Sequence, residues 1–462
     1  MKRTLSTLDA FCLGVLLAAG YGARPARADI ALTSEEVAAR TRATSAALAS
    51  RRADVLAAEA AVSEARIALW PRLAAAGFYA RYSPISAPTL GNVVAAQSPG
   101  PVGPDNPSVA APLRFPVLLN SVGVQLGLTL SASDYIFRFP HTIAAAKRTR
   151  DAAGAQGTAA EHNAWHDGRS LYYAWARAVL DKDVADVAVD QARAHLDFAR
   201  SRQGAGTGLS TEVIRFESEL ASAELLQRKL ADLIELLADQ LRTSMHDSRE
   251  DHYVIGETID GSDDESVPIV FKDCYQSALS HRAELTSLSA SMESEKEQAK
   301  ATGALMYPHL EIYGLGLASN PNPRYLPMED KFHLTWEVGA RLSYSPNELA
   351  IGLSQSRQHK ARAQGLDAQR QQMMEAIRDE VLAAVQARQE SALALGAAKK
   401  GRALAEDSLR VRRSLVAEGR ATYVDVIDAE TELVRARFAE VDAKIDARLA
   451  SIRLLRSMGT VE

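Results

Sequence analysis

The chain has 462 residues, a formal net charge of −5 and 24% charged residues. This charge has the wrong sign for a nucleic-acid-binding protein, which presents a basic surface to phosphates. Residues 1–28 combine a basic start, an apolar centre and the small-residue site Ala26-Arg-Ala28, a pattern typical of a secretory signal. This segment carries four basic residues and one acidic residue, so we expect a mature chain with a net charge of −8.

Cysteine usage and hydropathy restrict the mature chain further. Cys12 lies in the predicted signal, which leaves Cys274 without an intrachain disulfide partner. No segment after residue 28 has 18 consecutive apolar residues, the length that an α-helix needs to cross a bilayer. If the chain crosses a membrane, we expect it to do so with β-strands.

The first half of the mature chain predicts helix, strand, strand, long helix and return helix. Apolar and polar residues alternate strictly from Val122 to Leu130, which predicts a strand with one apolar face. Eight prolines between the two strands predict a long loop. The expected elements are a helix at 31–69, a strand at 71–82, the loop at 83–116, a strand at 118–131, and helices at 141–203 and 211–245.

A polar linker at 246–267 leads to a second half with the same order of elements. Its strand at 332–344 has the clearest alternation in the chain. One face of that strand carries Phe332, Leu334, Trp336, Val338, Ala340, Leu342 and Tyr344, and the other carries His333, Thr335, Glu337, Gly339, Arg341 and Ser343. The other expected elements are a helix at 268–307, a strand at 309–318, and helices at 349–416 and 423–458.

Two matches between the halves indicate a tandem repeat. The stretch from Gly419 to Leu433 resembles the stretch from Gly206 to Leu220, 213 residues earlier. In addition, Trp70-Pro71-Arg-Leu73 recurs as Tyr307-Pro308-His-Leu310. Two matches in the same order are not expected by chance. The sequence therefore predicts a first repeat at 29–245, a linker at 246–267 and a second repeat at 268–462.

Helix lengths indicate how these elements pack. The two shorter helices of each repeat together span ~110 Å, and the long helix spans ~95–100 Å. Two short helices placed end to end therefore match one long helix. A compact globular bundle is disfavoured, because such long helices have too little apolar surface to fold back on themselves.

Four strands per chain cannot close a barrel, and an open strand edge is not tolerated in lipid. Three chains would supply twelve strands, within the range of outer-membrane barrels. The apolar faces would then contact lipid through Phe332, Trp336 and Tyr344, and the polar faces would line a wet lumen through Gln125, Glu337 and Arg341. The alternative is a soluble sheet with one exposed face.

The predicted signal, the duplicated helix–strand–strand–helix units, the proline-led strands and the Val424-Asp-Val-Ile-Asp-Ala429 box after Gly419 resemble the TolC family of outer-membrane efflux proteins. The resemblance covers the mature chain. It implies a mainly helical fold with membrane β-structure: a homotrimer with a twelve-stranded β-barrel and a long α-helical barrel across the periplasm. It also implies a passive exit duct of a tripartite efflux pump or type I secretion system. The expected partners are a periplasmic adaptor and an inner-membrane pump.

The resemblance also implies site residues. The two aspartates of the family's box ring the periplasmic entrance and fall on Asp425 and Asp428. Independently of the resemblance, the sequence predicts Thr422 as the N-cap of the helix that holds them. Six carboxylates in a trimer would favour cations, attract blocking polycations and raise some of the carboxyl pKa values.

Further positions follow from the same resemblance. Thr211 and Glu212 fall where the family has residues that hold the entrance closed. The family's Tyr and Arg partners fall on Val416 and Ala421, and Arg420 is adjacent. The turn residues expected to receive adaptor hairpins are Gly206, Leu209 and Gly419.

Enzymatic interpretations fit poorly, and we expect no catalytic activity and no cofactor or metal. His162 and His166 lie four apart on a helix, but no Glu follows His162 as a zinc protease requires. The turn from Gly204 to Gly208 resembles a dinucleotide loop, but no strand precedes it. The remaining alternative is a periplasmic coiled-coil adaptor or structural protein without a pore.

Overall fold

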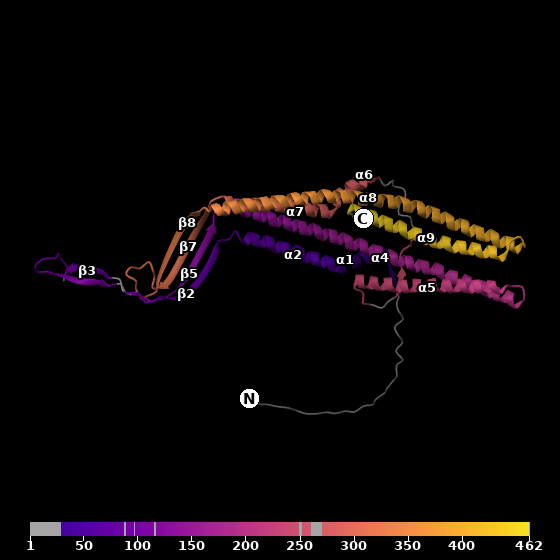
Figure 1. The fold of residues 1–462 in the computed structure, drawn as a ribbon, viewed down its shortest axis with the longest axis horizontal. Coiled ribbons are helices and arrows are strands. Elements are labelled where there is room, and N and C mark those ends of the chain that lie inside the picture. The colour runs from indigo at the N-terminus through magenta and orange to yellow at the C-terminus, as the bar shows by residue number, and fades with distance from the viewer. Residues whose placement is uncertain are drawn as a thin grey trace, which may run out of the picture.

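The computed structural model describes residues 29–86, 89–96, 98–114, 117–248, 252–259 and 270–461. Long helices lie side by side in a narrow shaft, and a sheet extends from one end of it (Figure 1). The predicted mainly helical chain with a four-stranded sheet is confirmed. The predicted signal at 1–28 and part of the linker at 246–267 lie outside the described residues.

The helices are α1 Ser34–Thr44, α2 Ala46–Ile67, α3 Asp134–Phe137, α4 Phe139–Gly204, α5 Ser210–Met245, α6 Phe271–His281, α7 Ala283–Gly303, α8 Pro346–Ala417 and α9 Tyr423–Met458, with the 3-10 turn η1 at Ala304–Met306. The strands are β1 Asp29–Leu32, β2 Arg72–Arg81, β3 Thr89–Ala96, β4 Ser108–Arg114, β5 Asn120–Ser131, β6 His252–Ile255, β7 His309–Asn320 and β8 His333–Ser343.

The shaft has the packing expected from helix lengths. Helices α2 and α5 follow one another along α4, and α7 and α9 follow one another along α8 (Figure 1). Helix α4 also contacts α7 and α9, so the two halves of the chain are joined along the shaft. Among the helices that the structure describes, none has a stretch long and apolar enough to cross a bilayer.

The largest core lies where the short helices meet around the middle of α4. Trp175 and Tyr172 of α4 are buried there against Leu241 of α5 and Ile445 and Ile452 of α9. The apolar spacing of α5 and α9 places these residues on one face of each helix. The parallel pair β1–β6 closes this core and ties the start of the described chain to the segment after α5. Four-residue strands are too short to show a pattern, so this pair was not predicted.

Two predicted helices are interrupted. The helix expected at 31–69 is instead β1, α1 and α2, because the Ser45 hydroxyl accepts a hydrogen bond from the Leu48 amide and starts α2 anew. The helix expected at 268–307 breaks at Arg282, which has an extended backbone. The Arg282 guanidinium donates to the carbonyls of Arg456 and Ser457 at the end of α9. A tertiary contact thus overrides helix propensity at this position.

The main sheet has the strand order β2-β5-β7-β8, and every neighbouring pair is antiparallel. β2 and β8 are therefore its edge strands. The loop expected at 83–116 was only partly right, because it contains the antiparallel hairpin β3–β4. The prolines of this segment argued against strands, so the hairpin was not predicted. Pro112 lies within β4 opposite Asn92, which is tolerated because both strands of a two-stranded ribbon are edge strands.

Candidate functional site

The turns between α4 and α5 and between α8 and α9 lie at the end of the shaft opposite to the main sheet, hereafter the free end (Figure 1). Gly206 and Gly419 have φ angles of 74° and 73°, which favour glycine. Each turn contains the same type of backbone hydrogen bond. The Thr207 amide donates to the Arg202 carbonyl in the first turn, and the Arg420 amide donates to the Leu415 carbonyl in the second. Both glycines are exposed, so the two turns are accessible to a partner.

Asp425 caps its own helix. Its Oδ2 accepts hydrogen bonds from the Thr422 amide at 2.8 Å and from the Thr422 hydroxyl at 2.7 Å, and the Thr422 hydroxyl accepts one from the Asp425 amide. These bonds complete a capping box at the start of α9, so the predicted N-cap is present. The hydrogen bonds from Thr422 lower the pKa of Asp425 within the single chain. Raised carboxyl pKa values in a ring need further copies and stay a prediction.

Asp428 faces the other hairpin. It is exposed, and its Oδ1 lies 4.0 Å from the Arg215 guanidinium of α5. The two box aspartates therefore have separate partners: Asp425 turns back to the start of its helix, and Asp428 turns toward α5.

The expected closing residues make contacts within their own hairpins. Glu212 lies 4.0 Å from Arg202, and Arg420 lies 3.4 Å from Glu418. Thr211 is exposed at the start of α5. Their expected role concerns contacts between neighbouring hairpins of an assembled ring and stays a prediction.

A buried cluster that the sequence interpretation missed joins the two hairpins near this end. His195 Nε2 on α4 lies 2.6 Å from Glu430 Oε2 on α9, and Arg413 Nη2 on α8 donates to Glu430 Oε1 at 2.5 Å. His195 and Glu430 are 4% and 8% exposed. The hydrogen bond from His195, together with that from Arg413, lowers the pKa of Glu430. The rings of Phe216 and Tyr423 pack against the imidazole.

An equivalent pair occurs in the first hairpin. Arg200 on α4 donates to Glu217 on α5 at 2.9 Å, and both residues lie 213 positions before Arg413 and Glu430. This first pair is exposed, whereas Glu430 is buried. The signal that could have revealed the cluster is an acidic residue within the apolar stripe of α9, because a buried carboxylate requires partners.

The main sheet has two chemically distinct faces. Phe332 and Tyr344, which flank β8, and Trp336 within it are exposed by 63%, 55% and 74%. Strand alternation and register place Gln125, Glu337 and Arg341 on the opposite face. On that face Glu337 forms an ion pair with Arg324, and the Arg341 guanidinium lies 5.3 Å from the Tyr313 ring.

The alternative chemistries gain no support. In the part of the chain that the structure describes, no group of three or more His, Cys, Asp or Glu residues could hold a metal ion. His166 is buried, and its Nε2 lies 3.0 Å from the Thr460 carbonyl. The glycine-rich turn after Gln203 follows a helix, whereas a dinucleotide loop follows a strand.

Comparisons with known proteins agree with this architecture. Residues 274–460 match the family described as outer membrane efflux protein. The chain resembles the outer membrane protein VceC of Vibrio cholerae at 17% identity and a TM-score of 0.70, over 93% of this chain and 97% of that one. It also resembles the Campylobacter jejuni CmeC outer membrane channel at 13% identity and a TM-score of 0.71, over 99% of this chain and 94% of that one.

A third similar structure is the open state of the Neisseria gonorrhoeae MtrE outer membrane channel, at 16% identity and a TM-score of 0.67, over 92% of this chain and 89% of that one. No curated protein matches this chain by sequence. The structural likenesses confirm the predicted fold class, and the family match confirms the predicted resemblance.

Proposed function

We propose that this chain, which carries the outer membrane efflux protein domain over residues 274–460, forms a passive exit duct of the outer membrane that extends into the periplasm. The observation that carries the proposal is the main sheet at the end of the shaft. One of its faces exposes large apolar side chains, and its strands β2 and β8 are edges. An exposed apolar face suits lipid, and strand edges must be paired before a sheet can lie in lipid.

Further copies of the chain can pair these edges. Successive strands alternate in direction, so β8 of one copy and β2 of the next run in opposite directions and can extend the same ladder. Three copies of the four-stranded sheet would close a twelve-stranded barrel. We therefore propose a homotrimer whose Phe332, Trp336 and Tyr344 contact outer-membrane lipid and whose Gln125, Glu337 and Arg341 line the lumen.

The free end of the shaft would be the periplasmic entrance. Asp425 and Asp428 would form its acidic ring, and Thr211, Glu212 and Arg420 would contribute to its closed state. A periplasmic adaptor would dock on the turns, where Leu209 is 67% exposed. Gly206 and Gly419 have no side chain to cover the backbone there, and, adjacent residues aside, no heavy atom of the described residues lies within 4 Å of where a Cβ would be. An inner-membrane pump would supply the energy, as in a tripartite efflux or type I secretion system.

We also propose that the chain is a tandem repeat of residues 29–245 and 268–462 with a linker at 246–267. The equivalent turns at Gly206 and Gly419 support this division. So do the equivalent pairs Arg200–Glu217 and Arg413–Glu430, each of which joins a long helix to its return helix.

A duct needs neither a catalytic group nor a cofactor, and we propose that the chain is not an enzyme. The alternative of a pore-free periplasmic adaptor or structural protein would place the main sheet in water. It is less favoured because Leu334, Trp336 and Val338 would each stay more than 70% exposed to solvent on one strand.

Site-directed spin labels on the two faces of β8 distinguish these possibilities. Leu334→Cys and Thr335→Cys are made separately with Cys274→Ala, labelled in the assembled protein and reconstituted in phospholipid. A membrane barrel gives the label at position 334 high accessibility to oxygen and low accessibility to a water-soluble nickel chelate, and gives the opposite at position 335. Preferential chelate access at position 334, or a monomer in mild detergent, would overturn the proposed duct.

A further inference from the structure

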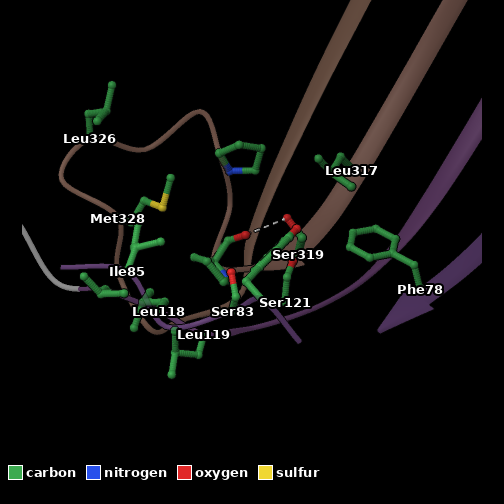
Figure 2. Close-up of a pocket in the computed structure, with 14 residues that line it drawn as sticks. Phe78, Ser83, Ile85, Leu118, Leu119, Ser121, Leu317, Ser319, Leu326 and Met328 are labelled. Carbon is green, nitrogen blue, oxygen red and sulfur yellow. Dashed lines mark hydrogen bonds between the residues drawn. The ribbon is translucent and has the colours of Figure 1, made fainter. Parts of the chain in front are cut away.

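An apolar cavity of about 650 Å³ (Figure 2) lies beside the strand ends of the main sheet that are farthest from the helices (Figure 1). Its fourteen lining residues include three serines and no charged side chain. Its three walls all come from one chain. The ends of strands β2, β5 and β7 form the floor, and the chain segments next to β2 and β5 and the loop between β7 and β8 form the other two walls.

The floor of the cavity lies on the polar face of the sheet, not on the face that carries Trp336. Phe78 pairs with Gly123 and Gly123 pairs with Ser319, so these residues share a face with Gln125 and Glu337. A Cβ atom on Gly123 would lie 2.8 Å from Phe78 Cζ and 2.7 Å from Ser319 Cβ. Glycine at position 123 therefore allows the Phe78 ring to lie across β5.

The β7–β8 loop folds back over this floor, and specific contacts hold it there. The Asn322 side chain is fully buried and donates to the His333 carbonyl at 2.9 Å and the Thr335 hydroxyl at 3.1 Å. The Tyr325 ring stacks on the His333 ring with 3.9 Å between the ring centroids, and Arg324 forms an ion pair with Glu337. These anchors fix the wall that carries Leu326 and Met328, so the cavity is preformed (Figure 2).

We propose that this cavity is a binding site for uncharged, apolar small molecules at the outer end of the duct. Its volume is typical of ligand sites, and a charged molecule would lose hydration there without gaining a charged partner. Of the three serines, Ser319 already donates from its hydroxyl to the Pro321 carbonyl at 3.2 Å. Most of the other lining side chains are apolar, so apolar contact is the main attraction. The location on the exit path rests on the proposed function.

The geometry favours a small molecule over two other occupants. A lipid acyl chain would have to reach the face of the sheet opposite to the exposed apolar one. A segment of a second copy would have to enter a cavity whose three walls are already supplied by one chain. Both occupants are outcomes of the test below, and either would overturn the proposal.

The test uses the full-length protein in lipid nanodiscs and the uncharged photolabel 3-trifluoromethyl-3-phenyldiazirine, with labelled peptides identified by mass spectrometry. Labelling of residues 78–85 and 117–121 should be saturable and should fall when excess unlabelled trifluoromethylbenzene is added. Labelling around Trp336 should rise linearly with probe and serves as the internal reference for partition into lipid. Competition by added phospholipid instead of by trifluoromethylbenzene, or absence of cavity labelling in trimers, overturns the proposal.

Leu118→Asp places a charge in the cavity wall and should reduce saturable labelling by about tenfold. The matched control is Val102→Asp at the exposed turn of the β3–β4 hairpin, which should leave labelling unchanged. Should Leu118→Asp not assemble, Met328→Trp fills the cavity and should have the same effect. Equal labelling of Leu118→Asp and Val102→Asp would overturn the proposed binding site. A wild-type protein that forms no trimers and conducts no ions would instead overturn the proposed function.

Discussion

His195 of α4 and Glu430 of α9 form a hydrogen bond of 2.6 Å that is buried between the two helical hairpins. Arg413 of α8 binds the second oxygen of the same carboxylate, so three helices meet at Glu430. The hydrogen bonds to this carboxylate favour its charged form and lower its pKa. The cluster therefore fixes how the two hairpins lie against each other close to the free end of the shaft.

Replacement of this carboxylate should destabilise the shaft. Glu430→Ala leaves a buried imidazole and a guanidinium without their acceptor, which we expect to cost about 3 kcal/mol of unfolding free energy at pH 7. The lowered pKa of Glu430 means that its contribution is present above the unfolded-state pKa and is lost as pH falls through the folded-state pKa. Urea unfolding followed by far-ultraviolet circular dichroism at pH 7 measures the change.

The first repeat offers the matched control for this experiment. Glu217→Ala removes the equivalent carboxylate from an exposed pair with Arg200, and we expect a loss below about 1 kcal/mol. Equal losses from Glu217→Ala and Glu430→Ala would contradict the role assigned to the buried cluster.

His166 should make the folded chain less stable in acid. Burial lowers its pKa from 6.5 to about 4. Below pH 6.5 the unfolded chain takes up a proton on this residue, whereas the folded chain does not until about pH 4. Stability is therefore lost progressively as pH falls between these values, by up to about 3 kcal/mol. The urea midpoint of His166→Gln should depend less on pH across this interval than that of the wild type, and parallel pH profiles would contradict the assignment.

The parts of the fold that could be predicted are those in which one periodic pattern decides the structure. Helix α9 spans the predicted residues 423–458, and β8 lies within the predicted strand, because each has an uninterrupted pattern. Ser45 and Arg282 broke expected helices through a local cap and a tertiary contact, and neither alters the apolar spacing. The cap at Thr422 was predictable from neighbouring residues, whereas His195 and Glu430 lie 235 residues apart and meet only in the fold.

Replacement of the two box aspartates should change conduction and leave assembly intact. Asp425→Asn with Asp428→Asn removes both charges and keeps an oxygen at position 425 that can accept from Thr422. We expect weaker cation selectivity and weaker block by polycations in planar bilayers, since the ring focuses negative potential at the entrance. The charge-matched control is Glu235→Gln with Asp239→Asn on the exposed side of α5. Unchanged selectivity in the box variant would remove the acidic ring from the proposed mechanism.

Alanine at the tip of the second hairpin should be destabilising for backbone reasons alone. Gly419 has a φ of 73°, and an added Cβ would meet nothing within 4 Å. Gly419→Ala should therefore cost about 1–2 kcal/mol, the penalty for an L-residue in the left-handed region. Gly401→Ala within α8, where an added Cβ is equally unobstructed, should instead stabilise by up to about 1 kcal/mol. Hydrogen exchange of the α8–α9 turn and urea midpoints measure the two effects, and the same sign for both would contradict this explanation.

Asn322 should control the accessibility of the β7–β8 loop. Its amide binds the carbonyl of His333 and the hydroxyl of Thr335, so Asn322→Ala releases the loop from the polar face of the sheet. We expect trypsin added outside intact cells to cut after Arg324 or Lys331 in the variant at least several-fold faster than in the wild type, because a protease needs a segment free to leave its support. Asn106→Ala provides the control: Asn106 binds Ser98 at the β3–β4 tip, so this change loosens a different outer segment and should leave cleavage after Arg324 slow. Equal cleavage in Asn322→Ala and the wild type would mean that Arg324–Glu337 and Tyr325–His333 suffice to hold the loop.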